Sequence, residues 1–176
     1  MAGEQEKTVA ALKYAIQMEI DGKEYYLKAS EQSRNPMGQK LLKNLAAEED
    51  IHRQRFQEIY AALQAKKAWP AVTYKGDAGK ALRTIFAQES ARLKNAAKGS
   101  KTELEAVQGA ISMEVKSYNY YQKHGKEAAF PAEKEYFNAL AAQERQHQML
   151  LLDYYEFLKD PAAYFVTKEH PNLDAG

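Results

Sequence analysis

Two short segments of the chain, LAAEEDIH and LAAQERQH, each hold a glutamate and a histidine three positions apart. The pairs are Glu49 with His52 and Glu144 with His147. Residues at this spacing lie on one face of an α-helix, so each pair offers a carboxylate oxygen and an imidazole nitrogen in the same direction. Such donors bind divalent metal ions. A single pair of this kind is more often a solvated surface feature, so its surroundings decide which interpretation holds.

The composition limits which metals and which chemistry these pairs can serve. The chain has 176 residues and no cysteine. The lack of cysteine excludes disulfides, thiolate metal sites, cysteine-ligated iron–sulfur clusters and a cysteine nucleophile. A metal site in this chain must therefore use oxygen and nitrogen ligands.

Charge and hydropathy make nucleic acid and membrane poor partners. Basic residues number 25 and acidic residues 24, spread along the chain, which gives no electrostatic footprint for nucleic acid or an anionic membrane surface. The opening MAGEQEKTVAAL has no basic segment followed by an apolar core, and no segment approaches the roughly 18 apolar residues of a membrane span. We therefore expect a cytoplasmic protein.

The elements that would position these pairs are helices. Apolar residues recur at three- and four-residue spacing between short breaks rich in Pro and Gly, and the period-two alternation of strands is missing. At the first break, NPMG, Pro36 disfavours helix just before itself and Gly38 relieves the turn. The pattern predicts an all-α chain, with a loop at 66–79 and helices at about 6–33, from the NPMG break to about 66, and at 82–94, 100–128 and 131–158. We expect one domain at 1–160, followed by a C-terminal tail at 161–176, in a segment whose sequence has no clear periodicity.

A shift of 95 residues superimposes the two halves of the chain. AIQME at 15–19 falls on AISME at 110–114, YYLK at 25–28 falls on YYQK at 120–123, and the two Glu-x-x-His segments coincide. The chain is therefore predicted to contain two copies of a helical hairpin. They are joined by a crossover of about 35 residues that includes the short helix, which makes the second and third long helices parallel rather than antiparallel.

The repeat matches each Glu-x-x-His segment with a glutamate on the other helix of its hairpin. Glu19 and Glu49 are equidistant from the first turn, and Glu114 and Glu144 are equidistant from the second. Residues equidistant from an antiparallel turn lie at the same height. All six side chains also lie on apolar helix faces, so the sequence predicts one buried cluster: Glu19, Glu49, His52, Glu114, Glu144 and His147. Glu48 and Asp50 are assigned to the helix surface.

Four carboxylates in an apolar core require compensation. One isolated ionised carboxylate in such an interior is unfavourable by several kcal/mol or more, and no Lys or Arg occupies these helix faces. Two divalent cations would balance the four charges, and neutral imidazoles would complete the coordination. Carboxylate and imidazole ligands suit iron or manganese, with zinc as a common alternative occupant.

Two tyrosines lie near the predicted cluster. Tyr26 and Tyr121 follow Glu19 and Glu114 by two turns on the same helix faces. Packing in the core with the hydroxyl satisfied elsewhere is one interpretation. A hydrogen bond to a metal ligand, or a redox role, is the other.

One glutamate from each of two helices, with Glu-x-x-His from each of the other two, is the pattern of ferritin-like di-iron and di-manganese bundles. Ala-Ile-x-Met-Glu followed by Tyr-Tyr, the crossover segment TIFAQES and the segment ELEAVQGAISMEVKSYNYY make the chain resemble the rubrerythrin branch of that superfamily, over about residues 8–158. The resemblance implies a ferritin-like four-helix bundle that holds two iron ions. Its metal ligands and metal-centred catalytic residues would be the six residues of the predicted cluster.

The resemblance also implies a function, with two departures. Rubrerythrins are usually peroxidases that reduce hydrogen peroxide with electrons from a rubredoxin-like donor, which protects against oxidative stress. Typical members carry a further glutamate three residues after the third-helix ligand, which takes part in a redox-linked movement of one iron, and here that position is Ser117. They also carry a rubredoxin domain whose iron is held by four cysteines, whereas this chain has none.

Electrons would therefore come from a separate rubredoxin-like protein or reductase. Dioxygen is the alternative oxidant, and a ferritin-like protein that oxidises iron for storage or sequestration is the alternative function. A metal-free structural bundle is the third hypothesis. We also expect a homodimer, with or without exchange of hairpins between chains.

Overall fold

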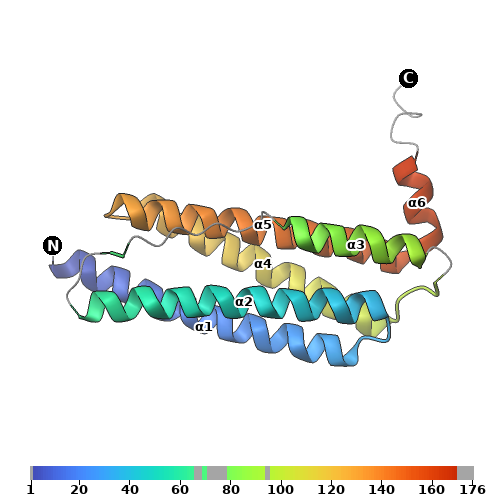
Figure 1. Ribbon diagram of the computed structural model, residues 1–176, viewed down its shortest axis with the longest axis horizontal. Coiled ribbons are helices and arrows are strands. Elements are labelled where there is room, and N and C mark those ends of the chain that lie inside the picture. The colour runs from blue at the N-terminus through green and yellow to red at the C-terminus, as the bar shows by residue number, and fades with distance from the viewer. Residues whose placement is uncertain (1, 66–68, 71–78, 94–95, 170–176) are drawn as a thin grey trace, which may run out of the picture.

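The computed structural model describes residues 2–65, 69–70, 79–93 and 96–169. These residues form six helices and contain no strand: α1 (Ala2–Gln32), α2 (Pro36–Gln64), α3 (Lys80–Arg92), α4 (Lys101–Glu127), α5 (Pro131–Lys159) and α6 (Pro161–Glu169). The four long helices form a bundle, as predicted (Figure 1). Most of the predicted 66–79 loop lies outside the described residues. No helix in the described part of the chain is long and apolar enough to cross a membrane.

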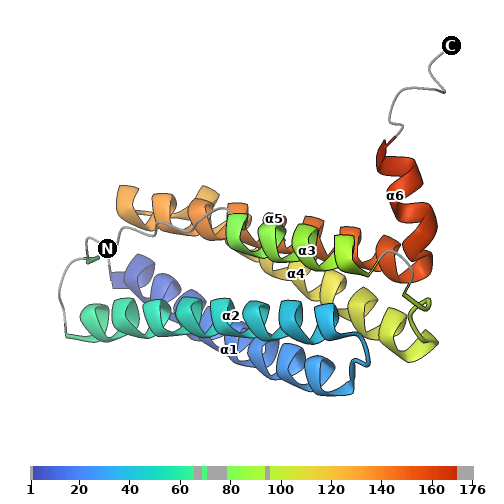
Figure 2. The same cartoon turned by 45° about the vertical axis from the view of Figure 1, so that its right-hand side comes forward.

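The long helices pack as two hairpins, α1 with α2 and α4 with α5. The hairpins meet chiefly along α1 and α4. Both views show α2 and α4 running in the same direction, as the long crossover predicted (Figures 1 and 2). Helix α3 packs against both α2 and α5, so the crossover covers the side of the bundle where these two helices face each other.

The first hairpin turn is fixed by the start of α2. Asn35 caps the helix, because its Oδ1 accepts hydrogen bonds from the backbone N–H of Met37 at 2.9 Å and of Gly38 at 3.3 Å. Pro36 occupies the first turn, where its missing N–H is not needed. Such a cap is worth about 1 kcal/mol. Our interpretation of Gly38 as a turn residue is wrong, since it lies inside α2, where a Cβ would collide with the Tyr154 hydroxyl.

The core has two apolar halves, one toward each end of the bundle. One half includes Leu41, Leu45, Leu151, Tyr154 and Phe157, and the other includes Leu12, Phe56, Ile59, Phe137 and Leu140. Each such side chain stabilises the fold by roughly 1.5–3 kcal/mol on burial. On all four long helices the residues of the predicted cluster lie between the two halves. The polar cluster is therefore enclosed by apolar side chains toward both ends.

The segment after the bundle contains a helix, α6, although its sequence shows no clear periodicity. Asp160 precedes α6, and its Oδ1 accepts a hydrogen bond from the N–H of Ala163 at 3.0 Å. Tyr164 and Phe165 pack edge-on against Phe157, with ring centroids 5.8 and 6.2 Å away. Helix α6 points away from the long axis of the bundle (Figures 1 and 2). The rest of the predicted tail, 170–176, lies outside the described residues, and the predicted domain boundary stays a prediction.

Candidate metal centre

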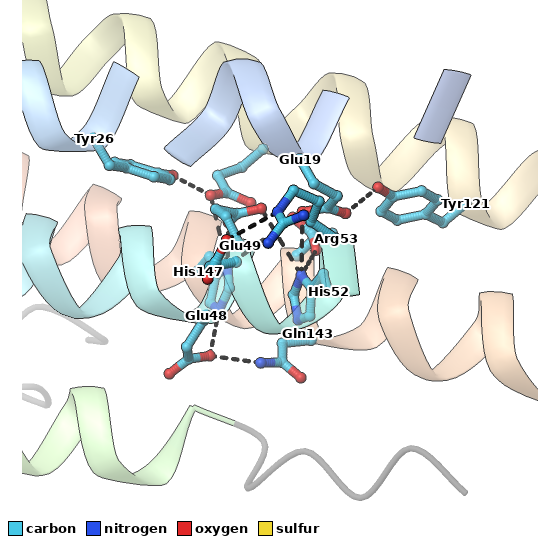
Figure 3. Close-up of polar contacts among 12 residues, drawn as sticks. Glu19, Tyr26, Glu48, Glu49, His52, Arg53, Tyr121, Gln143 and His147 are labelled. Atoms are coloured by element: carbon cyan, nitrogen blue, oxygen red, sulfur yellow. Dashed lines mark hydrogen bonds and ion pairs between the residues drawn. The ribbon is translucent and has the colours of Figure 1, made fainter. Parts of the chain in front are cut away.

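The bundle brings the six predicted side chains into one buried cluster, to which each long helix contributes (Figure 3). Glu19 comes from α1, Glu49 and His52 from α2, Glu114 from α4, and Glu144 and His147 from α5. None of the six is more than 5% exposed. The predicted meeting of these side chains is found, whereas their role as metal ligands stays a prediction.

The cluster divides into two overlapping groups, and in each group one ligand atom per residue lies within 4.8 Å of the others. The His52 half-site comprises Glu19, Glu49, His52 and Glu144, and the His147 half-site comprises Glu49, Glu114, Glu144 and His147. Glu49 and Glu144 belong to both groups. With two oxygens each, these two carboxylates could contribute to both half-sites, while each of the other four residues belongs to one half-site only.

Both imidazoles direct Nδ1 into the cluster. The Nδ1 of His52 lies 3.4 Å from Glu19 Oε2 and 3.4 Å from Glu144 Oε1. The Nδ1 of His147 lies 3.5 Å from Glu49 Oε1 and 3.6 Å from Glu114 Oε1. Two ligand atoms that bind the same ion, each at about 2.1 Å, are roughly 3.0–3.5 Å apart at ordinary coordination angles. The observed spacing therefore matches that of ligands around a shared ion.

Several donor atoms of the cluster form no hydrogen bond within the protein, although three of the carboxylate oxygens lie 3.4–3.5 Å from a histidine Nδ1. Glu19 Oε2, Glu49 Oε1, Glu114 Oε2, Glu144 Oε1 and His147 Nδ1 are buried without a hydrogen bond. Buried polar atoms are nearly always paired, and each unpaired one is unfavourable by about 1–3 kcal/mol. These atoms converge on the two half-sites, so two divalent cations would satisfy all of them. The residues present thus fit a two-metal centre.

When no metal is bound, the electrostatics of the cluster favour protons that are shared among its carboxyl groups and imidazoles. Burial and repulsion from Glu49 raise the pKa of Glu19 well above its usual range, and burial and the neighbouring carboxylates do the same for Glu144. Burial also opposes ionisation of Glu49, but the adjacent Glu19 carboxyl group and the two imidazoles outweigh it and lower its pKa. Burial disfavours the charged form of both histidines, yet the adjacent carboxylates raise their pKa values. Metal ions would displace the protons held in this way.

Tyr26 and Tyr121 connect the two hairpins at the cluster. The Tyr26 hydroxyl donates a hydrogen bond to Glu114 Oε1, and the Tyr121 hydroxyl donates one to Glu19 Oε1. Burial and the nearby carboxylates raise the pKa of both phenols, which keeps them protonated as donors. Both interpretations hold in part, because the two rings are buried in the core and their hydroxyls bond to candidate ligands, while a redox role stays a prediction.

Glu48 contacts the cluster from outside, a role that the sequence analysis missed. Its Oε2 lies 2.9 Å from His147 Nε2 and accepts a hydrogen bond from Gln143 Nε2 at 2.5 Å (Figure 3). The assignment of Glu48 to the helix surface is therefore incomplete, because this partly exposed carboxylate also contacts His147. The 95-residue shift pairs Glu48 with Gln143, which was the available signal that both lie at the height of the cluster. Asp50 does lie at the surface, paired with Lys23.

The positions one turn after the first glutamate of each hairpin add no carboxylate. They are Gly22 on α1 and Ser117 on α4. A Cβ at Gly22 would lie 3.6 Å from the carboxyl group of Glu49, so this position directly borders the cluster. The candidate ligand set is therefore symmetric between the two hairpins, with two shared glutamates and one glutamate–histidine pair for each half-site.

Comparison of the chain with protein-family models gives a match to the Rubrerythrin family over residues 10–155, and a second over residues 105–173. The first match includes all six residues of the cluster, and the second covers the second hairpin and α6. No curated protein and no solved structure matches the chain.

Proposed function

The chain belongs to the rubrerythrin family, and from this premise we propose that it is a di-iron oxidoreductase that reduces hydrogen peroxide, or dioxygen, with electrons from a separate donor protein. The observation that carries the proposal is the buried group of four glutamates and two histidines whose donor atoms converge on two half-sites. A purely structural bundle gains nothing from burying such a group, because it leaves charged atoms without partners.

The candidate ligands would be distributed symmetrically between the two ions. Glu19 and His52 would hold one ion, Glu114 and His147 the other, and the two shared glutamates would bind both. Bound iron would supply the electrons and the Lewis acidity that cleavage of an O–O bond requires. Oxygen and nitrogen donors without thiolate suit iron or manganese and also accept zinc.

The residues around the ligands fix their geometry and exclude water. The hydroxyls of Tyr26 and Tyr121 each donate a hydrogen bond to a carboxylate oxygen of the opposite hairpin. The two hairpins therefore cannot separate without breaking both hydrogen bonds. The two apolar halves of the core close the site toward both ends of the bundle. Reduction of peroxide to two water molecules consumes two electrons and two protons, and the phenols of Tyr26 and Tyr121 hold protons within the site.

The electron donor must be another protein or domain in this proposal, because the 176 residues contain no cysteine to bind a rubredoxin iron. The alternative is iron oxidation for storage or sequestration. It is favoured by Ser117, which stands where typical rubrerythrins have the additional glutamate of the redox-linked iron movement. A homodimer in the cytoplasm remains our expectation for the assembled protein.

Stopped-flow reoxidation tests the proposed function. The protein, loaded anaerobically with two ferrous ions per chain, is mixed with hydrogen peroxide or with dioxygen. We expect peroxide to oxidise the bound iron faster than it oxidises free ferrous iron, and size-exclusion chromatography to show a small oligomer. Reoxidation no faster than that of free iron refutes the enzyme, and a large cage that retains many irons per chain supports storage.

A further inference from the structure

The two half-sites have equivalent ligands, but their surroundings differ at the positions just before the two shared glutamates. Glu48 immediately precedes the shared ligand Glu49, and Gln143 immediately precedes the shared ligand Glu144. The internal repeat makes these positions equivalent, so one hairpin carries a carboxylate where the other carries a neutral amide. The six candidate ligands are symmetric between the hairpins. The difference between Glu48 and Gln143 therefore lies beside the ligands and not among them.

The carboxylate of Glu48 acts on the His147 half-site. Its Oε2 lies 2.9 Å from Nε2 of His147, the nitrogen on the far side of the ring from the cluster. An ionised carboxylate can only accept a hydrogen bond, so Nε2 carries the proton and donates it to Glu48. The lone pair of His147 is then at Nδ1, which faces Glu49 Oε1 at 3.5 Å and Glu114 Oε1 at 3.6 Å.

Gln143 holds Glu48 in this position. The amide Nε2 of Gln143 donates to the same carboxylate oxygen at 2.5 Å, and Gln143 is only 5% exposed. The Glu48 side chain is 20% exposed, so it lies at the boundary between the centre and solvent. Glu48 and Gln143 are thus in direct contact with each other, and the carboxylate of Glu48 faces His147.

A carboxylate that accepts the N–H of a metal-binding imidazole fixes the ring and makes its other nitrogen a stronger donor. We propose that the two half-sites are inequivalent, and that the first divalent ion binds in the His147 half-site because Glu48 orients and strengthens that histidine. This inference rests on the proposed two-metal centre. Loss of such a partner typically weakens metal affinity by about 10–100-fold, which sets the size of the expected difference.

Zinc is the probe, because it binds oxygen and nitrogen ligands without redox chemistry. Metal-free protein is crystallised with one equivalent of zinc, and anomalous scattering locates the ion. We expect a peak bounded by Glu49, Glu114, Glu144 and His147. Equal peaks in both half-sites, or a peak in the His52 half-site alone, overturn the inference.

Calorimetric titration with zinc provides the second measurement. Wild-type protein should show two binding steps, and Glu48→Gln should weaken the first step by about 10–100-fold while the second changes little. Asp50→Asn is the matched control, since it removes a charge two residues away whose partners are Lys23 and Arg53. It should leave both steps unchanged. An unchanged first step in Glu48→Gln, or an equal loss in Asp50→Asn, contradicts the role of Glu48.

The outcomes separate this inference from the proposed function. If wild-type protein binds no zinc or iron in the cluster, the two-metal centre itself fails. If it binds two ions with equal affinity and without preference for His147, the centre stands and only the inequivalence is refuted.

Discussion

Glu144→Gln should change stability in opposite directions in the metal-free and metal-loaded protein. Glu144 is 1% exposed, its Oε1 has no hydrogen-bond partner, and the surrounding carboxylates repel its charge. An amide of the same shape is neutral at every pH, so the variant avoids both the cost of burying this charge and the cost of taking up the proton that suppresses it. We expect the metal-free variant to gain about 1–3 kcal/mol, the usual cost of an unpaired buried group. For a chain of this size that corresponds to a rise in melting temperature of roughly 2–12 °C.

With metal bound, wild-type protein should be more stable than Glu144→Gln, because Glu144 belongs to both half-sites. An ion at a free concentration one hundred times its Kd stabilises the folded state by about 2.7 kcal/mol per site, so two ions stabilise wild-type protein by roughly 5 kcal/mol. The variant lacks a ligand of both ions and should lose most of this gain. Differential scanning fluorimetry, with and without zinc, measures both effects.

Glu133→Gln is the matched control. Glu133 is also buried, but it lies outside the cluster and its carboxylate accepts hydrogen bonds from the Thr8 hydroxyl at 3.1 Å and the Ala129 N–H at 3.2 Å. Its replacement should lower the melting temperature with and without zinc and leave the zinc-induced shift intact. If Glu144→Gln behaves like Glu133→Gln, the cluster is a structural network, and the reasoning about metal is refuted.

Three further predictions follow from the same geometry. Tyr121→Phe removes the donor to Glu19, so chemical denaturation should show a loss of about 1–3 kcal/mol in the metal-free protein; an unchanged midpoint contradicts the hydrogen bond. Because the pKa values of Glu19 and Glu144 are raised in the folded metal-free chain, their contribution to stability is full below the ordinary glutamate pKa and is lost as pH rises through the raised values. The same protons should be released when zinc binds at pH 7, and a pH-stat titration without proton release refutes this. Gly38→Ala should lower the melting temperature, since its Cβ meets the Tyr154 hydroxyl, and adding Tyr154→Phe should recover part of the loss.

Sequence reasoning located the long helices and the cluster because both depend on local, repeated signals. Pro36 and Pro131 begin α2 and α5, and the 95-residue repeat shows which glutamates face each other across each turn. Burial of the cluster then follows from the apolar faces on which its members lie. These signals need no knowledge of how the two hairpins pack together.

The features that were missed depend on contacts between distant parts of the chain. Position 38 lies inside α2 and is a glycine because the Tyr154 hydroxyl, far away in sequence, occupies the space that a Cβ would need. Glu48 lies at the edge of its helix face, and only the approach of α5 brings His147 to it. Helix α6 has nine residues, too few for a clear apolar period, and its aromatic contacts with Phe157 are tertiary.

The iron content of the purified chain tests the central claim most directly. Metal-free wild-type and Glu49→Gln proteins are loaded anaerobically with ferrous iron, freed of unbound metal and analysed for iron per chain. Glu49 belongs to both half-sites, so we predict two irons per wild-type chain and a loss of both in the variant. Wild-type protein that retains no iron, or a variant that still retains two, would contradict the assignment of this buried cluster as a two-metal centre.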